Sequence, residues 1–177
     1  VELVEELLSA ARAWLGSDLF RKRIEGSAAR TSSEVPIALE VADSVLRGSI
    51  DLLIEGDDAP PLVVDYKTDR LNGSAPGGHA ARYEIQRAIY ALAVAEARRA
   101  DEVEVAYVFL ERPEEPVLDT LGPAEMERAR KRLAELIGEI SRGSFPVAPP
   151  ESRSWDLCRG CPVLGVACSG PGNQAFG

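Results

Sequence analysis

The order of apolar and polar positions predicts helices at the start of the chain, followed by strands. Apolar residues recur at helical spacing twice within residues 1–25, with a break at Gly16-Ser17-Asp18. Period-two alternation follows in residues 34–41 and 45–55, and the apolar run at 61–67 is typical of a buried strand. Alternation should place the apolar side chains of the second strand on one face; they are Leu46, Gly48, Ile50, Leu52 and Ile54.

The second half of the chain alternates helix and strand. Helical periodicity predicts helices from about Ala80 to Arg99 and from Pro123 to Ser141, with a strand at Val103–Leu110 between them. Residues 72–78 are expected to form a loose loop, and the chain from Gly143 onward is irregular and carries all three cysteines. The order α–β–β–β–α–β–α predicts an α/β domain in which helices flank a mixed sheet.

Composition and charge narrow the functional classes. A chain of 177 residues suits one domain of ordinary size, and no stretch approaches the ~18 apolar residues of a membrane span. The N-terminus has no signal-peptide pattern, so we expect a cytoplasmic protein without a membrane segment. It has no initiator Met, which suggests a fragment of a longer chain. The net charge of −9 argues against a protein that coats DNA, but not against an enzyme that contacts DNA locally.

The most informative polar residues are Asp51, which follows Gly48 by three positions, and the run Asp65-Tyr66-Lys67. Residues two apart on a strand share a face, so Asp65 and Lys67 should lie together. If the strand of Asp51 pairs with this one, two carboxylates face one ammonium group. Carboxylate oxygens suit Mg²⁺, and the lysine could orient a water or neutralise charge on a phosphate. The same spacing also fits a cross-strand salt bridge.

A second polar set lies on the helix predicted at 80–99. Gln86 and Tyr90 are four residues apart and so share a face, with Tyr83 one turn earlier on the same side. They could hold the DNA backbone or support a metal site through hydrogen bonds. The alternative is that Tyr90 simply packs in the core.

These motifs in combination resemble one family: Gly48-x-x-Asp51, Asp65-Tyr66-Lys67-Thr68 and Tyr83-x-x-Gln86-x-x-x-Tyr90. They are similar to the RecB-type nuclease domain of the PD-(D/E)XK superfamily, over roughly residues 30–170. The resemblance implies a restriction-endonuclease-like fold. It also implies a metal-dependent DNA exonuclease attached to a helicase, with DNA as substrate, acting in DNA-break repair and recombination.

The resemblance also implies roles for individual residues. Asp51, Asp65 and the main-chain carbonyl of Tyr66 would bind Mg²⁺ or Mn²⁺, and Lys67 would assist the attacking water. Gln86 and Tyr90 would belong to the catalytic set. Glu34 matches an acidic position found before the first strand of such domains.

The cysteines form a further candidate site. Cys158-x-x-Cys161 and Cys168 suit a metal site better than a disulfide framework, although three reduced thiols without metal are the alternative. The resemblance implies a [4Fe–4S] cluster whose fourth cysteine lies outside this chain. His79, the only histidine, is a poor candidate for the fourth ligand. We expect the three cysteines to gather within a few ångströms of one another.

One departure from the family pattern affects the expected activity. RecB-type nucleases place a metal-binding histidine on a helix ahead of the strands, and residues 1–33 contain none. Truncation of a longer chain would explain both the absence of this histidine and the absence of the fourth cysteine. We therefore expect the chain alone to cleave DNA poorly, and better with Mn²⁺ than with Mg²⁺.

The expected organisation has three parts: N-terminal helices in residues 1–30, the nuclease core in 31–142 and the cysteine-bearing tail in 143–177. Two other functions stay open. The chain could be a non-catalytic scaffold of nuclease fold that guides DNA or braces a helicase. It could also be a phosphodiesterase that acts on another nucleic acid or on small phosphoesters.

Overall fold

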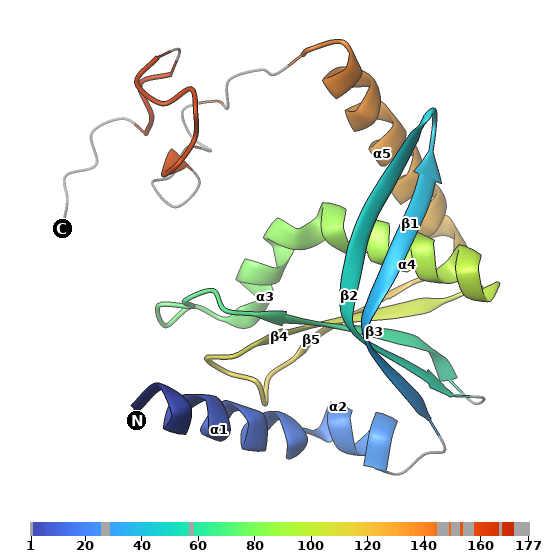
Figure 1. Cartoon of the computed structure of the whole chain (residues 1–177), viewed down its shortest axis with the longest axis vertical. Helices are drawn as coiled ribbons and strands as arrows, with labels where there is room; N and C mark the ends of the chain where they lie inside the picture. Colours follow the sequence, from blue (N-terminus) through green and yellow to red (C-terminus); the bar gives the residue numbers. More distant parts are fainter. Residues whose placement is uncertain are drawn as a thin grey trace. The chain divides into compact units, whose positions relative to one another are not determined.

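The computed structural model describes residues 2–25, 29–56, 59–144, 149, 153, 158–166 and 168–171. The chain divides into two compact units, Val1–Ile137 and Gly138–Gly177. The first unit holds a five-stranded sheet with the strand order β1-β2-β3-β4-β5 (Figure 1). None of the described helices is both long enough and apolar enough to cross a membrane.

The sheet is mixed. Its strands are β1 (Arg30–Val41), β2 (Ser44–Gly56), β3 (Ala59–Lys67), β4 (Val103–Phe109) and β5 (Val117–Leu121). The neighbours β1 and β2, β2 and β3, and β4 and β5 pair antiparallel, whereas β3 and β4 pair parallel. The parallel pair requires a crossover, and α3 and α4 supply it.

Helices cover both faces of this sheet. They are α1 (Glu2–Leu15), α2 (Asp18–Phe20), α3 (Pro76–Ala80), α4 (Glu84–Arg98) and α5 (Pro123–Ser141). A short π-helix (Arg21–Glu25) follows α2, and a 3₁₀ turn, η2 (Ala81–Tyr83), precedes α4. Figure 1 shows α1 and α2 on one face of the sheet and α4 on the other. The predicted α/β fold, a mixed sheet flanked by helices, is confirmed.

The core consists of two hydrophobic clusters, one on each face. The α4 cluster includes Val63 and Val105 from the sheet and Ala91 from α4, and it continues to Leu133 of α5. The Trp14 cluster consists of Trp14, Ile54, Leu62, Val64, Ala106 and Val108. Successive residues of β3 and β4 enter opposite clusters, so both faces of these strands are buried. This burial explains why residues 61–67 are an almost unbroken apolar run.

The structure corrects three sequence-based expectations about elements. The strand β5 was not predicted, because it is a five-residue edge strand in which Leu121 alone is buried and the other positions alternate between half-buried and exposed. Residues 72–78 are not wholly a loop, since α3 begins at Pro76, a residue that suits the first position of a helix. The helix expected from Ala80 to Arg99 is interrupted, because the 3₁₀ turn ending at Tyr83 separates α3 from α4.

The hairpin of β1 and β2 switches faces part of the way along its length. Leu46 and Ile50 pack in the α4 cluster, whereas Leu52 and Ile54 pack in the Trp14 cluster, so the expectation of one shared face is wrong. The switch occurs at Glu34, whose φ of 52° is left-handed. Register pairs lie on either side of this point, but none joins Glu34 to Asp51. Figure 1 shows the hairpin of β1 and β2 curving away from the other strands of the sheet.

Candidate active site

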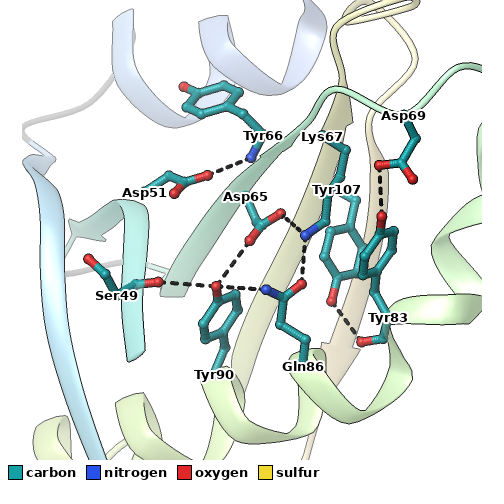
Figure 2. Close-up of polar contacts among 10 residues, drawn as sticks. All are labelled: Ser49, Asp51, Asp65, Tyr66, Lys67, Asp69, Tyr83, Gln86, Tyr90 and Tyr107. Carbon is teal, nitrogen blue, oxygen red and sulfur yellow. Dashed lines mark hydrogen bonds and ion pairs between the residues drawn. The ribbon is translucent and has the colours of Figure 1, made fainter. Parts of the chain in front are cut away.

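The candidate site lies where β2 and β3 part. Their paired residues end at Leu52 and Val64, and the next two positions in the same register are Asp51 and Asp65. Beyond this point a side chain of β2 binds the backbone of β3: Tyr66 N donates to Asp51 Oδ2 at 2.8 Å (Figure 2). The predicted pairing of the two strands is confirmed, and it places both carboxylates at the same end of the β2–β3 ladder.

Asp65 is the most deeply buried charged residue of the site, with 3% of its surface exposed. Its Oδ2 lies 2.6 Å from Lys67 Nζ, and its Oδ1 lies 3.1 Å from the Tyr90 hydroxyl. Burial raises the pKa of the Asp65 carboxyl; Lys67 and Tyr90 lower it in part, and the charge of Asp51 raises it further. The surroundings therefore leave the ionised carboxylate only partly stabilised, and a cation placed nearby would stabilise it.

Lys67 connects the strand to α4. Its Nζ donates to Gln86 Oε1 at 2.7 Å, and Gln86 Nε2 donates to the Tyr90 hydroxyl at 3.0 Å. The Tyr90 hydroxyl lies 3.1 Å from both Asp65 Oδ1 and the carbonyl oxygen of Ser49, and can donate to either. Burial, and then the charge of Asp65, raises the pKa of Tyr90, so its proton is retained. The structure thus brings Asp65, Lys67, Gln86 and Tyr90 into one hydrogen-bonded network.

Two further residues of this region were missed by sequence reasoning. The Tyr107 hydroxyl donates to the carbonyl oxygen of Tyr83 at 2.9 Å, and Asp69 accepts a hydrogen bond from the Tyr83 hydroxyl at 2.7 Å. Tyr107 carries a polar atom within the apolar run of β4, and that hydroxyl was the available signal. Asp69 has no comparable signal, because its partner comes from a separate element.

Two other candidates lie apart from the network. Glu34 is exposed on β1, at the register position across from Asp51. His79 lies in α3 with its ring against Phe109, at 6.0 Å between ring centroids. Its Nδ1 is buried and has no hydrogen-bond partner within the described residues.

The oxygen atoms of the site fit a hard divalent cation. Asp65 Oδ2 is buried and has no hydrogen bond of normal geometry in the described part of the chain, although Lys67 Nζ lies close to it. Asp51 supplies a second carboxylate. Within the described ranges no group of three or more His, Cys, Asp or Glu side chains could hold a metal. Two carboxylates suit Mg²⁺ or Mn²⁺, because such ions keep several waters and commonly take substrate phosphate oxygens. The part assigned to the Tyr66 carbonyl stays a prediction.

The three cysteines lie in the second compact unit, Gly138–Gly177. Cys158, Cys161 and Cys168 are free thiols that all lie in described segments, and they do not make up a metal-binding group. Cys161 N donates to Cys158 O at 3.0 Å in a tight turn that leaves Cys161 exposed, while the other two are half-buried. Cys168 forms an isolated backbone bridge with Leu164. The expected gathering of the three thiols within a few ångströms of one another stays a prediction.

Comparisons with known proteins give one family. The family model described as the PD-(D/E)XK nuclease superfamily matches residues 2–167. The solved structure of the protein SSO0001 is similar, with 17% identity and a TM-score of 0.44, covering 78% of this chain and 59% of that one. A protein of Eubacterium rectale described as a "putative exonuclease" has 15% identity and a TM-score of 0.49, covering 90% of this chain and 61% of that one.

The chain therefore spans about three fifths of the length of these two proteins. No curated protein sequence matches it.

Proposed function

Because the chain belongs to the PD-(D/E)XK nuclease superfamily, we propose that it is a metal-dependent deoxyribonuclease that hydrolyses the phosphodiester bonds of DNA. The observation that carries the proposal is the network in which the buried Asp65 contacts both Lys67 and Tyr90 beside Asp51. A purely structural ion pair would not need a second carboxylate, which raises the pKa of the first.

Each residue of the network has a distinct task in this proposal. Asp51 and Asp65 hold the cation, which, when bound, supplies Lewis-acid polarisation and lowers the pKa of a water. The hydroxyl of Tyr90 fixes one oxygen of Asp65 and leaves the other facing Lys67. Lys67 neutralises charge that develops on the phosphate and orients the attacking water.

Gln86 joins the two halves of the network. Its amide accepts from Lys67 and donates to the Tyr90 hydroxyl, so one side chain of α4 sets the positions of both groups. Because an amide accepts through its oxygen and donates through its nitrogen, a glutamate at this position could not make both bonds when ionised. The glutamine therefore aligns the lysine without adding a third negative charge.

The wider setting of the activity belongs to the same proposal. The motif set that resembles RecB-type domains supports an exonuclease joined to a helicase in the cytoplasm, acting in DNA-break repair and recombination. In that setting the helicase supplies the DNA strand. The net charge of −9 gives the chain little general attraction for DNA, which is consistent with delivery by a partner.

The test is a substrate comparison in Mn²⁺, in Mg²⁺ and in EDTA. We expect linear DNA to be shortened from its ends in Mn²⁺, more slowly in Mg²⁺ and not at all in EDTA. Covalently closed circular DNA and RNA of matched length should persist. Faster cleavage of RNA would favour a phosphodiesterase for another nucleic acid, and intact linear DNA in Mn²⁺ would favour a non-catalytic scaffold.

A further inference from the structure

Two tyrosine rings lie against Lys67 in addition to its polar partners. Lys67 Nζ lies 3.9 Å from the centroid of the Tyr83 ring and 5.4 Å from that of Tyr107. The two rings are themselves neighbours, with centroids 5.4 Å apart and planes inclined by 37°. They come from different elements, η2 and β4, and Figure 2 shows both beside the lysine. We call this pair of rings the aromatic wall.

Hydrogen bonds hold both rings of the aromatic wall in place. The Tyr83 hydroxyl donates to Asp69 Oδ2 at 2.7 Å, and the Tyr107 hydroxyl donates to the Tyr83 carbonyl oxygen at 2.9 Å. Tyr107 is fully buried and pairs with Asp65 in the β3–β4 register. The wall is therefore tied to the strand that carries Asp65 and to the start of α4.

We propose that Tyr83 and Tyr107 are positioning residues, whose rings hold the ammonium group of Lys67 against Asp65 and Gln86. An ammonium group has three N–H donors; Gln86 Oε1 accepts from one of them, and Asp65 Oδ2 lies 2.6 Å from Nζ as the ion-pair partner. A ring attracts the positive charge through its electron-rich face without accepting a conventional hydrogen bond. The aromatic wall therefore contacts the ammonium group and still leaves an N–H that no ring takes as a conventional acceptor would. In the proposed nuclease, on which this last step rests, that N–H points to substrate or water.

The chemistry of Tyr83 strengthens this contact. A phenol that donates to a carboxylate is polarised, so its ring carries more electron density and attracts a cation better. Burial, and then Asp69, raises the pKa of Tyr83 to about 12, so the hydroxyl keeps the proton that it donates. Cation–π contacts are strongest where water is excluded, and Lys67 is largely buried, with 11% of its side chain exposed.

The geometry can be tested without any cleavage assay. The chain has only three lysines, Lys22, Lys67 and Lys131, so [¹³Cε]lysine labelling gives a short NMR spectrum. Lys67→Arg identifies the Lys67 resonance by its loss. We expect the Hε protons of Lys67 to be shifted upfield by the ring current of Tyr83. Tyr83→Leu should abolish most of this shift and Tyr107→Leu a smaller part, whereas Tyr83→Phe should preserve it.

A matched control separates the loss of the ring from general destabilisation. Phe20 packs against Trp14 on the opposite face of the sheet, with ring centroids 5.6 Å apart. Phe20→Leu is also an aromatic-to-leucine change, and it should leave the Lys67 resonance in place. Thermal melts of the variants show whether each is folded at the temperature of the spectra.

Kinetics give the second readout. We expect Tyr83→Leu to lower kcat for Mn²⁺-dependent DNA cleavage about tenfold, with KM changed by less than about twofold. Tyr83→Phe should restore kcat to within about twofold of the original value. A fall of the same size in Tyr83→Phe would assign the effect to the bond with Asp69 and would overturn the role of the ring.

The two arms distinguish failure of this inference from failure of the proposed function. An unshifted Lys67 resonance, or a shift that survives Tyr83→Leu, overturns the aromatic wall whether or not DNA is cleaved. A shift that behaves as expected in a protein that cleaves no DNA supports the wall and contradicts the nuclease proposal instead.

Discussion

Asp65 shows, at the scale of one residue, how the site differs from a structural ion pair. Its carboxylate is buried in the sheet next to Lys67, yet its pKa is raised, because burial outweighs the lysine and the hydroxyl of Tyr90. A group whose charge is disfavoured in the folded protein lowers the stability of the fold. Such a residue is expected where function requires the charge, because a nearby divalent cation would make the ionised carboxylate the favoured form.

The first prediction follows from this imbalance. In EDTA, Asp65→Asn should unfold at a higher urea concentration than the original protein. The advantage should grow as pH rises from below the ordinary carboxyl pKa of about 4. The sign follows because the unfolded state releases this proton first, so the original fold loses stability until pH passes the raised pKa of the folded state. If Asp65→Asn is less stable than the original protein at neutral pH, the ion pair with Lys67 outweighs the cost of burying the Asp65 carboxylate.

A second prediction concerns Glu34, whose φ of 52° is unfavourable for a residue with a Cβ. Glu34→Gly should raise the free energy of unfolding by about 1 kcal/mol, because glycine adopts this conformation without the steric penalty. Glu40→Gly is the matched control, since Glu40 is an exposed glutamate of the same strand that lacks a positive φ. That change should destabilise the fold by about 0.5–1 kcal/mol. Urea denaturation measures the change in the free energy of unfolding for both variants. Changes of the same sign would contradict the predicted strain at Glu34.

At the scale of elements, α1 is fixed to the sheet mainly through one side chain. Trp14 is 6% exposed, and its ring makes T-shaped contacts with those of Phe20 and Tyr66, at 5.6 and 6.1 Å between centroids. Tyr66 lies between Asp65 and Lys67 in β3, but on the other face. The Trp14 cluster therefore packs against β3 on the face of the sheet opposite the candidate site.

The third prediction tests this support. Trp14→Ala should lower the free energy of unfolding by about 3–5 kcal/mol, because it removes a large buried ring and leaves a cavity. Leu15, the next residue, is 49% exposed, and Leu15→Ala should change the free energy of unfolding by less than about 0.5 kcal/mol. Denaturation curves followed by circular dichroism give both values. Similar losses in the two variants would show that α1 packs differently from the structure described.

The elements also show what a sequence can and cannot predict here. Period-two alternation predicted β2, the apolar run at 61–67 predicted β3, and the two-residue spacing of Asp65 and Lys67 predicted that they lie together. The face switch at Glu34 was not predictable, because a single left-handed residue leaves the apolar pattern unchanged. The contact of Tyr107 with Tyr83 was missed because it joins residues 24 positions apart in the chain. The expected cysteine cluster stays a prediction, because C-x-x-C spacing alone does not fix where the sulfur atoms lie.

At the scale of the whole molecule, the tyrosines set a limit on stability at high pH. The pKa values of all four, Tyr66, Tyr83, Tyr90 and Tyr107, are raised, with burial as the largest cause of each. The folded state therefore keeps protons that the unfolded state releases near pH 10. Stability must fall as pH rises above that value.

The fourth prediction is that tyrosinate forms only when the protein unfolds. In alkaline titration, the ultraviolet absorbance of tyrosinate and the loss of circular dichroism should rise together in one cooperative step above pH 10. The same titration in concentrated urea should give a broad curve centred near the ordinary tyrosine pKa of about 10. Gradual ionisation near pH 10 in the folded protein would contradict the burial described for these rings.

The central claim is that Asp65 serves a metal-dependent nuclease site, and one measurement tests it most directly. It is the rate at which linear DNA is cleaved in Mn²⁺ by the original protein, by Asp65→Asn and by Asp101→Asn, a change at an exposed aspartate. The account predicts measurable cleavage by the first and third proteins and a loss of at least about a hundredfold in Asp65→Asn. Equal rates in all three proteins, or cleavage that persists in EDTA, would contradict it.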